Sequence, residues 1–374
     1  MVNRGVWDRV FEVLCVRGHK DTALVRLGGP RNDERPHPHP RTGVGAGLRR
    51  ARVRRVGSSI IRRMHLARLP DELTALPPWS KNKLRQLGEC LRDEVEPGDG
   101  LPEYDDVLLW YDGIATATQR VIRSLDWDGI LGAGRTFEVT SRAKTRDTLT
   151  AKLLRDRGHP LSSVQDVAGV RFEAEMTLSE QDKASAAIAQ ALGCESSDGV
   201  HDLRADPHSG YRAVHVWARL PAGRVEVQVR THLQGQWANA YEAFADIVGR
   251  GVRYGETHSN PTTASLAQEL QELSVARGAD LERLRDRAAL GDTTIEALMT
   301  ELDSRRHAIA LRKRPWLRFR LWRARLALAK TKRQQVYIHK TQSELEAEYS
   351  RSLGDIEDVC RRAKARGGST WPVS

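Results

Sequence analysis

The stretch V-E-V-Q-V-R-T, residues 225–231, decides the fold. Three valines alternate with Glu226, Gln228 and Arg230, which is the period of a strand with one buried face. The valines therefore face a core, while a carboxylate, an amide and a guanidinium share the opposite face. Polar outer faces are common on strands, so the meaning of this one depends on what the rest of the chain brings beside it.

The composition of the chain indicates which kinds of partner it binds and in which cellular compartment it works. The 374 residues carry a formal net charge of +11 and a pI near 9.7, which favours phosphate-bearing partners such as nucleotides or RNA. The four cysteines are widely separated and form no C-x-x-C pair, so we expect neither a disulfide framework nor a zinc site. No apolar run approaches the length of a membrane span and no signal peptide pattern is present. We expect a cytoplasmic protein without a membrane partner.

The chain divides by composition. Residues 1–63 are rich in Arg, Gly and Pro and are predicted to be a basic, disordered segment. Residues 64–100 read as a short helical lead-in that ends at the turn signal P-G-D-G. Residues 101–258 begin with an amphipathic helix to about Leu125 and contain the motifs described below. Residues 259–374 are predicted to be a helical, basic C-terminal region.

Two stretches supply cations and a carboxylate. Residues 138–144 read as a strand with Arg142 and Lys144 on one side, followed by a helix start whose second turn carries Lys152. Free N–H groups at a helix N-terminus with cations beside them favour phosphate binding. Asp166 stands just before a second apolar strand that contains Arg171. Together with Glu226, Asp166 would offer the hard oxygen ligands that Mg²⁺ prefers.

A third stretch, S-G-Y-R-A-V-H at 209–215, reads as a turn leading into a strand. Its Tyr211 and His215 fall on one face, where Tyr211 would stack on a base and His215 would hydrogen-bond a phosphate or sugar. Taken without the other motifs, the stretch is better interpreted as a core tyrosine and a histidine whose hydrogen bonds are satisfied.

These stretches together resemble the synthetase domain of RelA/SpoT proteins, the alarmone (p)ppGpp synthetases. The resemblance covers about Tyr104 to Gly255 and includes W-A-N-A-Y-E at 237–242. Its motifs, in chain order, are R-A-K-T-R-D-T-L-T-A-K, Q-D-V-A-G-V-R, S-G-Y-R-A-V-H and V-E-V-Q-V-R-T. The resemblance implies an α+β fold, a nucleotidyltransferase-like mixed sheet flanked by helices, with the helical C-terminal region following it.

The resemblance also implies an activity: the β,γ-pyrophosphoryl group of ATP moves to the ribose 3′-hydroxyl of GDP or GTP. Asp166 and Glu226 would bind Mg²⁺, Glu226 would also activate the acceptor hydroxyl, and Gln228 would orient it. The implied ATP-binding residues are Arg142 and Arg171, which would sandwich adenine, and Lys144 and Lys152, which would hold the phosphates. The implied acceptor-binding residues are Tyr211, His215 and Arg230.

One departure concerns the acceptor. Where the family has K-x-N-G-Y, this chain has P-H-S-G-Y at 207–211. A toxic branch of the family, whose members pyrophosphorylate an adenosine nucleotide or the tRNA 3′ end, is therefore the alternative, and it would bring an antitoxin partner. A homo-oligomer is also open. A catalytically silent nucleotide- or RNA-binding module is the alternative from another class, although Asp166, Glu226 and Gln228 are all present.

The C-terminal region raises a separate question. Residues 312–340 interleave many Arg and Lys with Trp316, Phe319, Trp322 and several leucines. A solvated amphipathic helix, an RNA-binding surface and a membrane-surface helix all suit this pattern. We expect Gly291-Asp292 to open a new helical segment and Gly354 to break the last one.

Overall fold

The computed structural model describes residues 69–156, 158–194, 198–306 and 315–365, all within the compact unit Arg54–Ser374. The predicted basic segment 1–63 lies outside these residues. Along the chain the main elements are α3 (Asp71–Thr74), α4 (Lys81–Arg92), α5 (Tyr104–Arg123), α6 (Trp127–Leu131), β1 (Phe137–Ala143), α7 (Arg146–Arg155), β2 (Ala168–Ala174), α8 (Leu178–Ala191), β3 (Val200–Asp202), β4 (Val214–Arg219), β5 (Arg224–Thr231), α9 (His232–Val248), α10 (Pro261–Glu272), α11 (Ala279–Arg306) and α12 (Pro315–Ala365). Short 3₁₀ turns lie at Leu161–Ser163, His208–Gly210 and Arg250–Tyr254.

The sheet is mixed and has the strand order β1-β2-β5-β4-β3. β2 and β5 are parallel, and the other three neighbouring pairs are antiparallel. The predicted strand at residues 225–231 is therefore the centre of the sheet, with a partner on each side. The predicted α+β fold, a mixed sheet flanked by helices and followed by a helical region, is confirmed.

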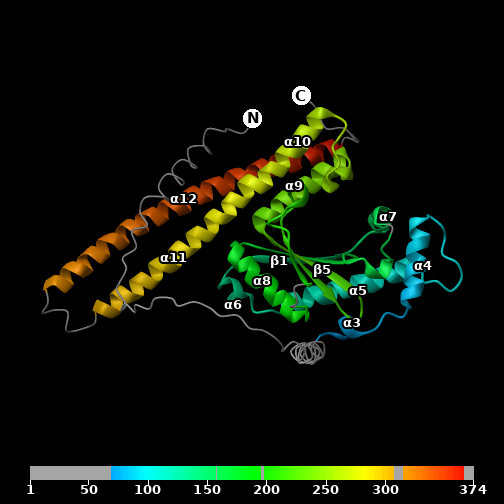
Figure 1. Ribbon diagram of the computed structural model, residues 1–374, viewed down its shortest axis with the longest axis horizontal. Helices are drawn as coiled ribbons and strands as arrows, with labels where there is room; N and C mark the ends of the chain where they lie inside the picture. Colours follow the sequence, from blue (N-terminus) through cyan, green and yellow to red (C-terminus); the bar gives the residue numbers. More distant parts are fainter. Residues whose placement is uncertain (1–68, 157, 195–197, 307–314, 366–374) are drawn as a thin grey trace, which may run out of the picture. The chain divides into compact units, whose positions relative to one another are not determined.

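One face of the sheet is apolar and covered. Val225, Val227 and Val229 are fully buried, and α5 and α8 pack against the strands on that side (Figure 1). The stripe predicted for residues 102–125 is the buried face of α5, with Val107, Tyr111 and Ile114 among its members. The opposite face carries the polar residues of the strands, and α9 lies against it.

The C-terminal helices pack on α9 and on one another (Figure 1). α10 passes into α11 through a π-helical segment, Leu273–Gly278. α11 and α12 run side by side, and Arg285 of α11 makes two hydrogen bonds, of 3.0 and 2.8 Å, to Glu346 of α12. No described helix is long and apolar enough to cross a membrane.

Two predicted breaks in these helices are wrong. α11 runs through Gly291-Asp292 and α12 runs through Gly354 without interruption. At Gly291 the reason is packing, since a Cβ there would lie 2.4 Å from the side-chain oxygen of Gln335 on α12. Glycine at this position allows the two helices to approach closely, and neighbouring helical contacts outweigh its low helix propensity.

Candidate active site

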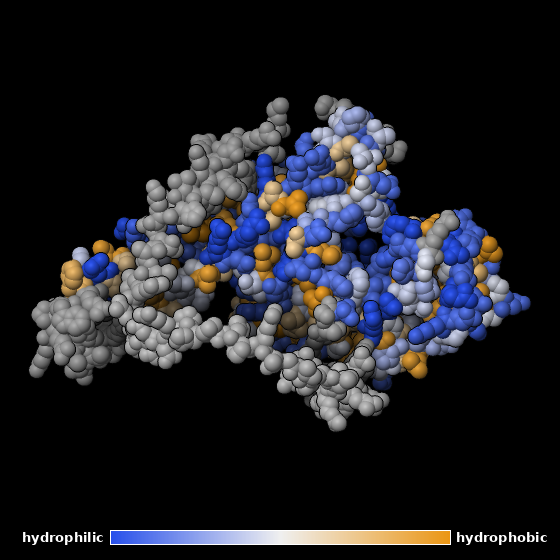
Figure 2. Space-filling model, viewed as in Figure 1, coloured by the Kyte–Doolittle hydropathy of each residue, from blue (hydrophilic) through white to orange (hydrophobic). Residues whose placement is uncertain are grey.

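The candidate site is the polar face of the central strands. Glu226, Gln228 and Arg230 of β5 stand beside Gly169, Arg171 and Glu173 of β2, because the two strands pair in that register. On the other side, Gln228 stands beside His215 and Glu226 beside Trp217 of β4. The space-filling view shows a recess at this place, between α9 and α7 (Figure 2).

Two lysines and one aspartate form a cationic cluster at the edge of this face. The Nζ atoms of Lys144 and Lys152 each lie 2.7 Å from a different oxygen of Asp166. Burial would raise the pKa of Asp166, but the two ammonium groups outweigh it and hold that pKa below its ordinary value. Two positive charges against one negative leave a net positive cluster, which suits a phosphate chain.

Glu226 is buried and receives three donors. Trp217 Nε1 donates to Oε1 at 3.1 Å, and Gln228 Nε2 donates to Oε2 at 2.9 Å. His215 Nδ1 lies 3.3 Å from Oε1. Burial raises the pKa of Glu226, and the negative charge of Asp166 adds to this, but His215 and Gln228 lower it below its ordinary value overall. Glu226 is therefore ionised at neutral pH.

His215 links Glu226 to Tyr211. Its Nε2 lies 2.9 Å from the Tyr211 hydroxyl, while its Nδ1 faces Glu226. Burial alone would lower the pKa of His215, but Tyr211 and Glu226 raise it to about 9. A protonated imidazole donates from both nitrogens, so it satisfies the two oxygens at once.

Arg230 ties the acceptor-side residues together. It donates to the Tyr211 hydroxyl at 2.9 Å and to Gln228 Oε1 at 2.6 Å, and its guanidinium lies over the Tyr211 ring at 5.0 Å. A second contact joins it to Glu173 at 3.5 Å. Arg230 is almost fully buried, so these contacts take the place of water around its guanidinium group.

The remaining cations surround Glu242 of α9. Arg171 and Arg253 approach its two carboxylate oxygens at 3.3 and 3.2 Å. Burial raises the pKa of Glu242, but Arg253, Arg171 and Arg142 lower it below its ordinary value overall. Arg142 contributes although its side chain is exposed. Arg142 and Arg171 are on adjacent strands, two residues apart in register. They therefore lie diagonally on the same face.

Comparisons with known proteins identify the family of this chain. Residues 141–245 match the family model described as a region found in RelA / SpoT proteins. An uncharacterised protein of Mycobacterium bovis and one of Mycobacterium tuberculosis are each 45% identical over 218 residues, 58% of this chain and 74% of theirs. The chain belongs to the RelA/SpoT family.

Solved structures resemble the chain more distantly. The small alarmone synthetase 1 from Bacillus subtilis is 17% identical, with a TM-score of 0.37 over 49% of this chain and 96% of that one. A GTP pyrophosphokinase family protein from Streptococcus pneumoniae is 18% identical, with a TM-score of 0.36 over 49% and 93%. Membership of the RelA/SpoT family rests on the mycobacterial relatives and the family model.

The site of this RelA/SpoT protein gathers every residue predicted for it. Lys144, Lys152 and Asp166 meet at one end. Glu226, Gln228, Arg230, Tyr211 and His215 form one connected network, with Arg171 and Arg142 beside it. One local expectation is wrong: β4 begins at Val214, so Tyr211 directly follows the 3₁₀ turn His208–Gly210 and is not part of the strand.

Sequence reasoning missed three members of the site. Trp217 reaches Glu226, Glu173 reaches Arg230, and Arg253 reaches Glu242. Strand periodicity could have found Trp217, since it follows His215 by two residues and so shares its face. Glu173 could have been found in the same way from Arg171. Arg253 lies on a 3₁₀ turn beyond α9, where no periodic pattern applies.

The residues present fit a magnesium ion. The negative charge of Asp166 raises the pKa of Glu226, and both residues offer carboxylate oxygens. No cluster of three or more His, Cys, Asp or Glu that would hold a metal occurs among the described residues. A two-carboxylate site of this kind suits Mg²⁺, which takes its remaining ligands from phosphates and water.

Proposed function

We propose that this protein is an ATP-dependent pyrophosphokinase that transfers the β,γ-pyrophosphoryl group of ATP to the ribose 3′-hydroxyl of GDP or GTP. One observation carries the proposal: Glu226 and Gln228 lie between a lysine cluster suited to phosphates and a Tyr211 network suited to an acceptor. The reaction needs both halves on one face, because the hydroxyl must reach phosphorus in line with the leaving group.

The donor half works by exchange of ion partners. Lys144 and Lys152 now contact Asp166. The phosphates of ATP compete for the same ammonium groups, and their binding releases the Asp166 oxygens. Asp166 and Glu226 would hold Mg²⁺, which would neutralise charge on the pyrophosphoryl group. Arg142 and Arg171 would stack on the adenine, which requires Arg171 to leave or share Glu242.

The acceptor half orients the nucleophile. Tyr211 would stack on the acceptor base, with His215 and Arg230 holding its hydroxyl in place. Gln228, fixed between Glu226 and Arg230, would orient the ribose hydroxyl. The bond between O3′ and the β-phosphorus forms, the bond from that phosphorus to the α,β-bridging oxygen breaks, and AMP leaves. Glu226 accepts the hydroxyl proton as the new bond forms.

The test is a product assay with several acceptors in parallel. Purified protein receives Mg²⁺ and ATP labelled at the γ-phosphate, with GDP, GTP, ATP alone or deacylated tRNA. The proposal predicts label in a guanosine product and one AMP for each transfer. Absence of AMP and of labelled product with every acceptor would reject it and favour a catalytically silent binding module.

A second candidate acceptor, the tRNA 3′ end, is supported by the surface of α12. Phe319, Trp322 and Leu326 are 58%, 56% and 60% exposed, and between Asp303 and Glu344 the sequence has 13 Lys and Arg without an acidic residue. Such a surface would bind phosphates through its cations and exposed bases through its aromatics. Label on tRNA with empty guanosine lanes would select this acceptor.

A further inference from the structure

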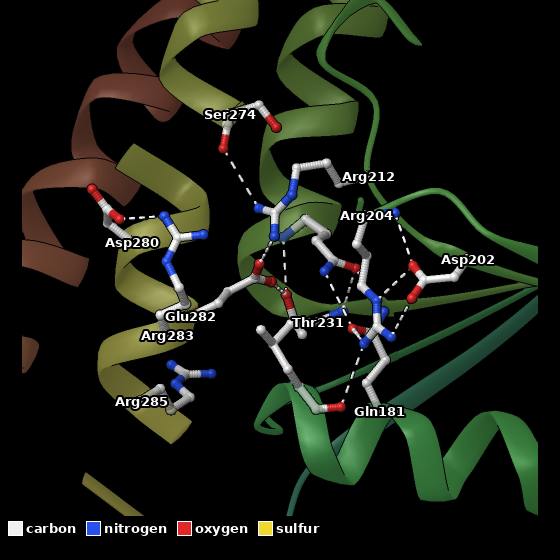
Figure 3. Close-up of polar contacts among 12 residues, drawn as sticks. Gln181, Asp202, Arg204, Arg212, Thr231, Ser274, Asp280, Glu282, Arg283 and Arg285 are labelled. Atoms are coloured by element: carbon white, nitrogen blue, oxygen red, sulfur yellow. Dashed lines mark hydrogen bonds and ion pairs between the residues drawn. The ribbon is translucent and has the colours of Figure 1, made fainter. Parts of the chain in front are cut away.

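The residue after Tyr211 connects the acceptor side to the C-terminal helices. Arg212 pairs with Glu282 of α11 (Figure 3). The two side chains are only 5% and 1% exposed. The other terminal nitrogen of Arg212 donates to the backbone carbonyl of Ser274, in the π-helical segment, at 3.5 Å.

The same carboxylate holds a second part of the site. Thr231 Oγ1 donates to the remaining oxygen of Glu282 at 2.5 Å. Thr231 follows Arg230, ends β5 and caps the N-terminus of α9. Glu282 therefore bonds to Arg212 and Thr231, which directly follow Tyr211 and Arg230 in the chain. Arg230 in turn donates to the Tyr211 hydroxyl at 2.9 Å.

The turn that carries Tyr211 depends on outside support. Ser209 has a φ of 49° and Gly210 a φ of 80°, and such a conformation costs free energy at a non-glycine residue. A Cβ at Gly210 would lie 2.8 Å from the Trp237 ring and 2.9 Å from the Gln271 Cα. The turn therefore packs between α9 and α10, and the pair of Arg212 with Glu282 connects the residue after Tyr211 to α11.

We propose that Glu282 is a positioning residue for the acceptor, acting through Arg212 and Thr231 on Tyr211 and Arg230. This inference rests on the proposed function, since it assigns Tyr211 and Arg230 to acceptor binding. On this inference, α11 in the C-terminal region positions residues that bind the acceptor. Within the described part of the chain, the donor cluster of Lys144, Lys152 and Asp166 makes no hydrogen bond or ion pair with Glu282.

The inference predicts a split between the two substrates. Glu282→Gln removes the charge that Arg212 needs and is expected to raise the acceptor KM about tenfold, a change typical of residues that act on a site from outside it. The KM for ATP should change by less than about twofold, because the donor cluster is untouched.

A double variant separates positioning from loss of stability. Removing one member of a buried ion pair destabilises a fold, whereas replacing both by apolar residues is often neutral. Arg212→Met combined with Glu282→Met should therefore have a higher melting temperature than Glu282→Gln, while its acceptor KM stays raised. Recovery of the acceptor KM together with stability would overturn the inference, because Glu282 would then act only as scaffold.

Glu346→Gln is the matched control. It breaks the contact of α11 with α12 through Arg285 without touching Arg212 or Thr231. Its acceptor KM should equal that of the wild type. An equal rise in this control would overturn the inference, since any loosening of the helices would then suffice.

Backbone hydrogen exchange keeps the two proposals distinguishable. If the wild type transfers nothing to any acceptor, the proposed function fails. The structural part of the inference still predicts faster exchange at residues 209–213 in Glu282→Gln and in the double variant than in the Glu346→Gln control. Equal exchange in all three would overturn it whatever the activity.

Discussion

Trp217 fixes one oxygen of the Glu226 carboxylate through its indole N–H, at 3.1 Å. The Trp217 ring is itself held by His201 of β3, with ring centroids 3.9 Å apart. The orientation of the Glu226 carboxylate is therefore fixed by Trp217 of β4, which His201 of the edge strand β3 supports, and by Gln228 of its own strand.

Loss of this donor should slow transfer. Trp217→Phe keeps the contact with His201 but removes the indole N–H, and a hydrogen bond to a charged group contributes about 1.5–3 kcal/mol. We expect kcat to fall about 10- to 100-fold with little change in the KM for ATP. Trp110→Phe, which removes a hydrogen bond to the carbonyl of Ala222, is the control. Equal kcat values in the two variants would contradict a role for Trp217.

The cluster of Lys144, Lys152 and Asp166 should determine the affinity for ATP. Lys152→Met removes one of the two ammonium groups on Asp166, and we expect the KM for ATP to rise about 10- to 100-fold while the acceptor KM is unchanged. Lys183→Met, on α8 against the other face of the sheet, controls for the loss of one surface charge. A rise in the acceptor KM alone would show that the donor and acceptor halves are exchanged.

His215 should make stability depend on pH. Its pKa in the folded protein is about 9, above about 6.5 in an unfolded chain. Protonated His215 therefore stabilises the fold fully below about pH 6.5, and this contribution disappears as the pH rises through 9. The difference in unfolding free energy between wild type and His215→Gln, measured with urea, should shrink by about 2–3 kcal/mol over that range. A constant difference would mean that His215 is neutral throughout.

Replacing Gly291 of α11 and Gly354 of α12 by alanine should change the stability of the protein in opposite directions. Gly354→Ala meets no atom within 4 Å, so it should stabilise α12 by up to about 1 kcal/mol. Gly291→Ala would push on Gln335, which donates to the carbonyl of Ala288 at 2.5 Å. We expect it to destabilise by about 1–3 kcal/mol. Thermal unfolding measures the stability of both variants. Stabilisation by Gly291→Ala would contradict the close packing of α11 against α12 at this position.

Local periodicity accounts for what could be predicted from the sequence. The alternation at 225–231 correctly separated the buried valines from Glu226, Gln228 and Arg230. The same rule indicated that Arg142 and Arg171 lie on strands. The resemblance to RelA/SpoT proteins then supplied the order of the motifs, and the strand register brings the residues of those motifs to one face.

Contacts distant in sequence could not be predicted in this way. Arg212 and Glu282 are 70 residues apart, and in the sequence each looks like an ordinary surface charge. Gly291 looked like a helix break, because its role depends on Gln335, 44 positions later. In each case the deciding partner lies on another element, and neither propensity nor periodicity carries information about it.

The most direct test of the central claim is the comparison of Glu226→Gln with Glu138→Gln. Both remove a carboxylate, but Glu138 is exposed near the start of β1, at the far edge of the sheet. With labelled ATP, Mg²⁺ and GDP, we expect Glu226→Gln to lose about 10²- to 10⁴-fold in transfer and AMP release, while its dissociation constant for ATP stays within about threefold. Glu138→Gln should behave as wild type. Wild-type turnover in Glu226→Gln would contradict the assignment of this face as the active site.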